Sequence, residues 1–218
     1  MNAATSDDHI SVDFIDPLFA VALGLNFEEI GKEHWFGHIL TGLGAPDTRF
    51  IMATLLLGYT TVVLSWVGYH RSIKRHPIRL GKSSGWGRFI LDVVLLILYF
   101  FLLVRYHDFA GELCVLAGIY FLFIVWDFFK MIEHPRKDYG SEEKWLRSVA
   151  QRGVTVFWFI VFLAFAFFYR FSPPRERFAY QDWLLLIFAL AATILYRVHK
   201  DKQWFRPVLL FLGYRCAE

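Results

Sequence analysis

Long apolar segments alternate with short charged stretches along this chain, and this alternation limits the folds that it can adopt. Six segments of 14 to 20 residues are apolar: residues 14–27, 50–69, 89–104, 113–129, 154–169 and 183–196. An α-helix needs about 20 residues to cross about 30 Å of hydrocarbon, so the shorter segments must extend into their polar flanks. Hydrophobic residues make up 56% of the chain and charged residues 20%, which is more apolar than a soluble domain usually is. We therefore expect a single all-α integral membrane domain over residues 1–218, with six transmembrane helices and short loops.

Lys and Arg residues are distributed unevenly over the connections between these segments. Of the 23 basic residues, 17 fall in residues 69–88, residues 130–152 and the part of the chain after residue 196. In a six-span topology these three regions lie on the same side of the membrane, and the other side holds the remaining six. Loops rich in Lys and Arg stay in the cytoplasm. The sequence therefore predicts that both termini are cytoplasmic, in a protein that contacts lipid in a bacterial inner (plasma) membrane.

Two further segments are too short or too mixed to be spans. Residues 28–49 combine Trp35 and Phe36 with several glycines, a pattern that predicts an interfacial segment on the outer face, with a re-entrant loop as the alternative. Residues 204–214 contain a short apolar run after Pro207. We expect this run to form a helix on the cytoplasmic membrane surface.

Four ionisable residues enter the apolar segments near their predicted cytoplasmic ends: Asp16, His70, Asp92 and Asp127. A charge at the centre of a transmembrane helix costs about 2.5 to 3.5 kcal/mol, so each needs a partner, water or a function. Because all four are predicted at one depth, we expect them to form a buried polar network that holds the helix ends together. Simple ion pairs with the flanking basic residues explain Asp92 and Asp127 equally well.

The first apolar segment carries a short motif. Residues 14–16 read Phe-Ile-Asp and are followed by small and aliphatic residues over 17–23. This pattern resembles the first helix of the lysosomal and prokaryotic potassium-channel family that is marked by a Phe-Ser-Asp motif. Residues 66–71, Trp-Val-Gly-Tyr-His-Arg, look like the end of that family's second helix, with Tyr69 in the place of the first of two histidines.

The resemblance covers residues 10–71 and departs from the family at three positions. Ile15 replaces the Ser of the motif, Pro17 follows the Asp, and Ile10 stands where the family has an upstream Arg. The resemblance implies an ion channel that assembles as a homo-tetramer around its first helix. It also implies a constriction made by aliphatic side chains rather than by a carbonyl filter.

Carried over by position from the motif, the constriction of this chain would be formed by Val21 and Leu25, with Glu28 one turn further out. These three residues lie on one helical face at i, i+4 and i+7. A ring of aliphatic side chains gates by dewetting, and a ring of Glu favours cations. The same face could instead pack against other helices of the same chain.

The histidines and cysteines do not form a recognisable catalytic or metal-binding pattern. His34 and His38 are spaced i, i+4, but no third ligand with a matching spacing accompanies them, and a metal site needs three or four. We therefore expect no catalytic residues, no metal and no cofactor, and a protein that is not an enzyme.

The connection after residue 69 is the densest basic patch, with Arg71, Lys74, Arg75 and Arg79. Such a patch on the cytoplasmic side suits an anionic ligand or a partner protein, and we expect no nucleic acid. These features favour a ligand-gated or partner-gated channel subunit, of the kind that a bacterial antiviral defence system would use as a membrane effector. The alternative is a non-conducting scaffold or adaptor that recruits a soluble partner through its basic loops.

Overall fold

A computed structural model describes residues 46–76, 83–105, 108–171 and 180–202, together with Ile78 and six residues of the N-terminal segment. Those six are Pro17, Phe19, Ala20, Val21, Gly24 and Glu28, all helical. The elements are α3 (Pro46–Arg75), α4 (Ser83–Val104), α5 (Phe109–Glu133), the short 3₁₀ helix η2 (Arg136–Tyr139), α6 (Glu142–Phe171) and α7 (Tyr180–Lys202). No strand occurs in the described parts, so the predicted all-α class is confirmed for them.

Five helices are long and apolar enough to cross a membrane: residues 48–74, 83–104, 109–133, 142–171 and 180–200. They correspond to the last five predicted segments, and each extends further into its polar flanks than the apolar run alone. The largest difference is in α6, which begins at Glu142 rather than at residue 154. The predicted span 14–27 and the predicted surface helix 204–214 lie mostly or entirely outside the described residues. The end of the predicted interfacial segment 28–49 belongs to α3, which begins at Pro46.

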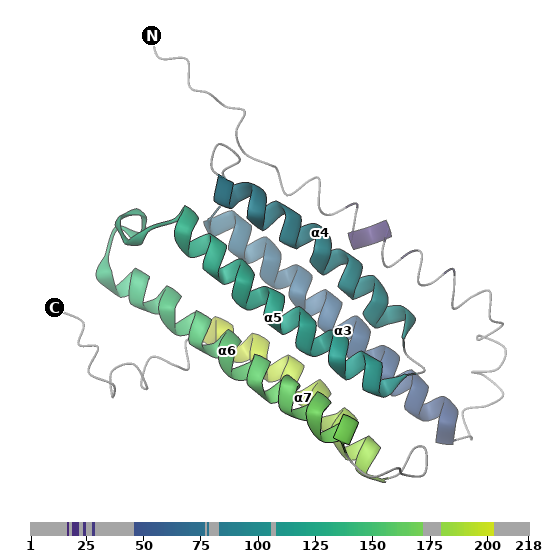
Figure 1. Ribbon diagram of the computed structural model, residues 1–218. Helices are drawn as coiled ribbons and strands as arrows, with labels where there is room; N and C mark the ends of the chain where they lie inside the picture. The colour runs from purple at the N-terminus through teal and green to yellow at the C-terminus, as the bar shows by residue number, and fades with distance from the viewer. Residues whose placement is uncertain are drawn as a thin grey trace.

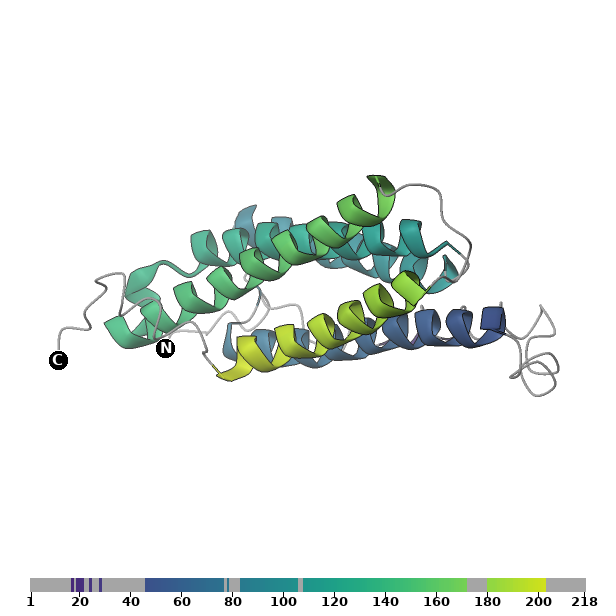
Figure 2. The ribbon, with the colours of Figure 1, turned by 90° about the horizontal axis from the view of Figure 1, so that it is seen from below.

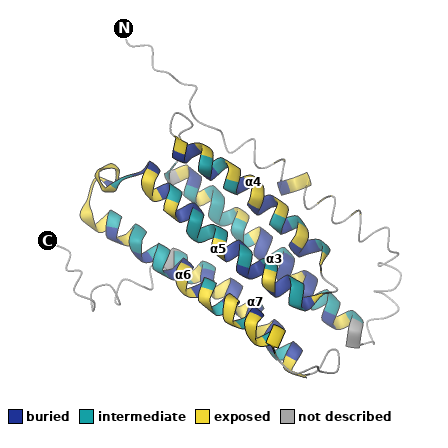
Figure 3. Cartoon of the chain, viewed as in Figure 1, coloured by how far each residue is buried: buried dark blue, intermediate teal, exposed yellow. Residues whose placement is uncertain are grey.

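The outward faces of the bundle are apolar. Large hydrophobic side chains are exposed along α4, such as Ile90 and Phe101, and along α6, such as Ile160 and Phe167, and exposed residues follow the outer face of each helix in Figure 3. A water-soluble bundle would place polar residues at such positions, whereas a bilayer solvates apolar ones. The length and the surface of these helices are those of an integral membrane protein.

The helices form two layers (Figures 1 and 2). In one layer α5 packs between α4 and α6, and in the other α3 packs against α7. Contacts of α3 with α4 and of α6 with α7 join the layers. Helices α3, α5 and α7 finish at the same end of the bundle, where α4 and α6 begin. We call this end, which carries the connections 76–82 and 134–141, the basic end, and the other the distal end.

Close approach of α4 and α5 depends on a glycine near the basic end. A Cβ atom added to Gly87 would lie 2.7 Å from the ring of Phe129 on α5. A Cβ atom added to Gly118, at the α5 face towards α4, would only reach Leu98 at 3.9 Å, which is an ordinary contact. The two glycines therefore differ in what an added methyl group would meet.

We expect Gly87→Ala to destabilise the bundle by about 1 to 3 kcal/mol, because overpacking forces the Phe129 ring out of place. Gly118→Ala is the matched control, and we expect it to stabilise by about 0.5 to 1 kcal/mol because Ala is the better helix former. Unfolding by SDS in mixed micelles, followed by circular dichroism, measures both. Equal changes in the two variants would contradict the close approach at Gly87.

Candidate functional site

A cavity of about 630 Å³ lies between the two layers of the bundle. Its wall is built from α3, α4, α5, η2, α6 and α7, with Phe19 of the N-terminal segment. On α3 the lining runs from Thr61, near the middle of the span, to Ser72 at the basic end, a distance of about 16 Å along the helix. The volume is that of a site for a small molecule.

The distal half of the bundle is filled mainly by apolar side chains, and the Glu112 carboxylate is buried among them with no hydrogen-bond partner in the described part of the chain. Leu57, Leu103 and Leu113 are completely buried, and each lies on its helix beyond the residues that line the cavity. Among the described residues, this apolar layer separates the cavity from the distal end. The cavity therefore belongs to the basic end of the bundle.

The cavity wall carries more positive than negative side chains. Six basic residues line it, and the acidic residues are Asp92, Asp127 and Asp138, so the wall has three positive charges in excess. The basic residues are Arg71, Lys130, Lys144, Arg147, Arg197 and Lys200. An excess of one sign inside a low-dielectric wall attracts ligands of the opposite sign.

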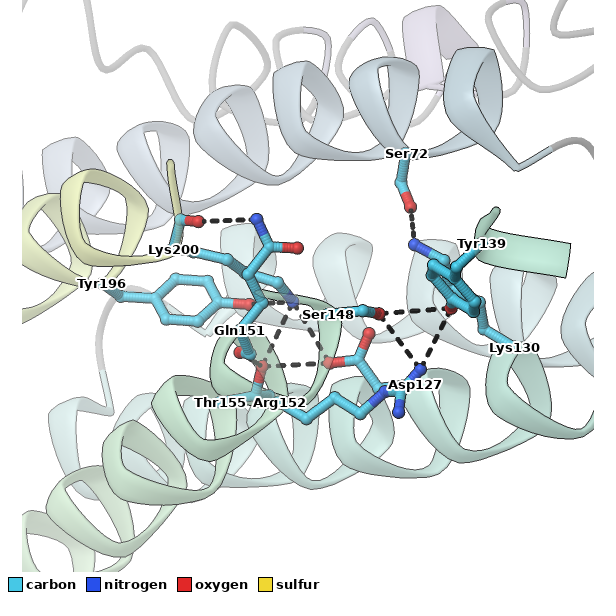
Figure 4. A network of polar contacts seen from close by, with 10 residues as sticks. All are labelled: Ser72, Asp127, Lys130, Tyr139, Ser148, Gln151, Arg152, Thr155, Tyr196 and Lys200. Carbon is cyan, nitrogen blue, oxygen red and sulfur yellow. Dashed lines mark hydrogen bonds and ion pairs between the residues drawn. The ribbon is translucent and has the colours of Figure 1, made fainter. Parts of the chain in front are cut away.

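Asp127 is held by one helix of each layer (Figure 4). The Lys200 ammonium of α7 lies 3.3 Å from Asp127 Oδ2, and the Thr155 hydroxyl of α6 donates to the same oxygen at 3.0 Å. Lys200 also donates to the Tyr196 hydroxyl at 3.0 Å. The carboxylate of Asp127 is thus occupied by partners from α6 and α7, and it ties α5 to both helices.

Lys130 lies one turn further along α5, and its side chain is only 9% exposed. Its ammonium donates to the Ser72 hydroxyl of α3 at 3.0 Å and lies 5.6 Å from the centre of the Trp126 ring. Neither partner is charged, and no carboxylate of the described residues is within ion-pairing distance of Lys130 Nζ. This buried lysine borders the cavity without an ion pair of its own, since the Asp127 carboxylate one turn away is bonded to Lys200 and Thr155.

Arg152 of α6 is a second cation in this region that lacks a carboxylate among the described residues. Its Nη2 donates to the Tyr139 hydroxyl at 3.3 Å and to Ser148 Oγ at 3.2 Å. Its Nη1 is buried, and no described group accepts a hydrogen bond from it. In Figure 4 dashed lines join Arg152 to Tyr139 and Ser148, whereas Lys130 is joined to Ser72.

Asp92 belongs to a separate cluster around Trp126. Trp126 Nε1 donates to Asp92 Oδ1 at 2.9 Å, and the Tyr69 hydroxyl donates to Oδ2 at 3.2 Å. The guanidinium of Arg88 lies 4.5 Å from the centre of the Trp126 ring and forms an ion pair with Glu133, both side chains being fully buried. This cluster closes the wall of the cavity where α4 meets α5.

A glycine on α3 lets an arginine of α7 reach the cavity. A Cβ atom on Gly68 would lie 2.1 Å from Nη1 of Arg197, so the guanidinium lies directly on the α3 backbone. Any larger residue at position 68 would displace it. Gly68 and Arg197 both line the cavity.

The structure brings together two members of the predicted polar network and separates a third. Asp92 and Asp127 both line the cavity, but each has its own set of partners. His70 instead donates from Nδ1 to the Trp66 carbonyl at 3.2 Å and contacts the Trp66 ring edge to face. It is not among the residues of the cavity wall, which its neighbour Tyr69 lines. Asp16 lies outside the described residues.

The predicted basic patch is only partly at the cavity. Arg71 lines it, whereas Lys74 is exposed elsewhere. The side chains of Arg75 and Arg79 lie outside the described part of the chain.

The predicted pore residues belong to the N-terminal segment. Val21 is 55% exposed, and Glu28 is also exposed. Leu25 lies outside the described residues. Phe19 is buried in the wall of the cavity, where its ring lies 5.7 Å from that of Tyr99 and 6.4 Å from that of Tyr69.

Sequence reasoning missed Lys130, Arg152 and Lys200, which it counted among loop or tail residues. These positions lie just outside the apolar runs, yet the helices include them. The available signal was helical spacing: Asp127 and Lys130 share one face of α5 at i, i+3.

No protein-family model, curated protein or solved structure matches this chain. The likeness to the potassium-channel family therefore stays a prediction. Among the described residues, no three His, Cys, Asp or Glu side chains are grouped as metal ligands. The chemistry of the site follows from its own residues, which offer several cations, few carboxylates and many aromatic rings.

Proposed function

We propose that this membrane protein binds an anionic small molecule in the cavity at its basic end. The observation that carries the proposal is the buried Lys130 ammonium, which has a hydroxyl and an aromatic ring as partners but no carboxylate. A buried charge without a counter-charge is strongly unfavourable, and more so within a membrane. An anion in the cavity would supply the missing charge to Lys130, which lines it.

The predicted topology gives this site a direction. With 17 of the 23 basic residues on one side, the basic end faces the cytoplasm, so the ligand arrives from there. The apolar layer of Leu57, Leu103 and Leu113 keeps the ligand from passing to the distal side. This arrangement suits a receptor for a cytoplasmic anion better than a transporter of it.

The test is binding of ATP and of tripolyphosphate to the purified protein in nanodiscs of neutral lipid, measured by isothermal titration calorimetry. We expect saturable binding of at least one of these anions, with an affinity that falls as salt rises because the contacts are ionic. If neither probe binds at low salt, the proposed anion site is wrong.

A second candidate function, ion conduction, is favoured by which residues of the N-terminal segment are buried and which are exposed. At about 100° per residue, Val21, Gly24 and Glu28 fall on the helix face opposite Phe19. Phe19 is buried against the bundle, whereas those three residues are exposed. An exposed face that combines a glycine with a Glu is suited to contact with other copies of the chain around a pore. We propose a homo-tetramer in which this face lines the axis.

If that face lines a pore, Val21→Ala will raise the leak conductance by widening and wetting the constriction. Glu28→Lys will shift the selectivity towards anions, seen as a change in reversal potential across a salt gradient. Planar-bilayer recordings measure both, and Val63→Ala, an exposed position on α3, is the control. A monomer without conductance, with or without ATP, would contradict the channel and favour the non-conducting scaffold.

A further inference from the structure

The inner part of the cavity is aromatic and hydroxyl-rich rather than aliphatic. We call seven aromatic and hydroxyl-bearing residues in the inner part of the cavity the deep wall: Phe19, Thr61, Ser65, Tyr99, Tyr120, Thr193 and Tyr196. Among the described lining residues, two leucines, Leu64 and Leu95, lie beside them. Aromatic walls favour a flat ring, which they contact face to face or edge to face.

The hydroxyl groups of the deep wall argue against an apolar occupant. Thr61 donates its hydroxyl proton to the Leu57 carbonyl at 2.8 Å, and Thr193 donates to the Ala189 carbonyl at 3.0 Å. Because their protons are used within their own helices, these two oxygens can offer only lone pairs to an occupant. Thr193 also shares a hydrogen bond with Tyr120, and a ring with amino or ring N–H groups would donate to the lone pairs that remain.

Lys130 lies at the opposite end of the cavity from the deep wall, whereas the Lys200 ammonium reaches the deep wall and donates to the Tyr196 hydroxyl at 3.0 Å. Lys130 is ten residues from Tyr120 along α5, which separates the two positions by about 15 Å. A phosphate held at Lys130 would therefore fill only the mouth. The remaining volume would take a flat polar group that is linked to the phosphate and directed towards the middle of the membrane.

From this division we propose that the ligand is a nucleotide, with its phosphates at Lys130 and Arg147 and its base in the deep wall. The inference rests on the proposed function, because it presumes that the cavity binds an anion. It adds a class of ligand and an orientation: the base enters first and the phosphates stay at the basic end.

The test compares three probes that divide the ligand into its parts. ATP carries both phosphates and base, tripolyphosphate has the phosphates alone, and adenosine has the base and ribose alone. Titrations use nanodiscs of neutral lipid without divalent cations. We expect ATP to bind at least tenfold more tightly than tripolyphosphate, and adenosine to bind weakly.

Variants then locate the base. Thr193→Val removes one deep-wall hydroxyl and keeps the side-chain shape, and we expect a threefold to tenfold loss of ATP affinity with tripolyphosphate unchanged. Thr54→Val is the matched control, because Thr54 is equally buried and donates to the carbonyl four residues earlier at 2.6 Å but lies outside the cavity wall. It should change neither affinity. Thermal unfolding of each variant verifies that it is folded.

The outcomes of these experiments distinguish failure of the nucleotide inference from failure of the proposed anion site. Equal affinity for ATP and tripolyphosphate, or equal effects of Thr193→Val on both, would overturn the nucleotide and leave a simple anion site. If phosphatidylglycerol in the nanodiscs abolishes ATP binding, the lipid competes for the cavity. That result would overturn the nucleotide in favour of a lipid headgroup. Failure of every probe to bind would overturn the anion site itself.

Discussion

Replacing Lys130 with Met is expected to lower the affinity for ATP about tenfold to a hundredfold and, at the same time, to stabilise the unliganded protein. The first effect follows because a hydrogen bond to a charged group contributes about 1.5 to 3 kcal/mol. The second follows because Met removes a buried ammonium that has no carboxylate partner and fills the same space beside Trp126. If Lys130 had a purely structural role, Lys130→Met would lower both the stability of the protein and its affinity for ATP.

Calorimetry gives the affinity of Lys130→Met, and thermal unfolding with and without ATP gives the stability. The affinity of the wild type should also depend on salt more steeply than that of the variant, since one ionic contact is gone. Lys137→Met is the control: Lys137 is exposed on η2 at the same end and does not line the cavity. An unchanged ATP affinity in Lys130→Met, or an equal loss in Lys137→Met, would remove Lys130 from the site.

Breaking the Arg88–Glu133 pair is expected to have the largest effect on stability. Both side chains are fully buried, so Glu133→Gln leaves the Arg88 guanidinium without a counter-charge. Loss of one partner of a buried pair destabilises by about 3 to 5 kcal/mol. Arg88 also lies on the Trp126 ring and donates to the His76 carbonyl at 3.2 Å, so we expect the basic end of the bundle to loosen first.

The double variant Arg88→Met with Glu133→Met tests whether charge is the cause. Replacing both members of a buried pair by apolar groups is often close to neutral, so most of the lost stability should return. The exposed pair Arg136–Glu142, with atoms 2.5 Å apart and side chains 60% and 44% exposed, is the control. Glu142→Gln should change the unfolding free energy by about 1 kcal/mol or less. SDS unfolding that gives Glu133→Gln and Glu142→Gln the same small loss would contradict the buried pair.

The partners of the charges within the helices were not predictable from the sequence. Asp92 and Asp127 were expected near one end of their helices; both line the cavity, but α4 begins at Ser83, so Asp92 lies near the middle of that helix. The partner of Asp127 is Lys200, which is 73 residues away. Such a pairing depends on how two helices are rotated about their own axes, and the hydropathy of the sequence does not predict this rotation.

The ends of the helices were also harder to predict than their existence. The apolar run that begins at residue 154 was read as the start of a span, whereas α6 begins at Glu142. The first turns of α6 carry polar residues that a helix accepts readily and a hydropathy scan rejects. Arg147 and Arg152 were therefore taken as loop residues, although α6 directs Arg147 to the cavity wall and Arg152 to Tyr139 and Ser148.

Hydropathy and helix length along the chain were sufficient to predict an all-helical membrane protein and the positions of five spans. These properties are local, because each helix satisfies its own backbone hydrogen bonds and meets lipid directly. The cavity, the lone ammonium of Lys130 and the buried face of Phe19 arise only when the two layers meet. They depend on how side chains from distant helices fill, or fail to fill, the space between those layers.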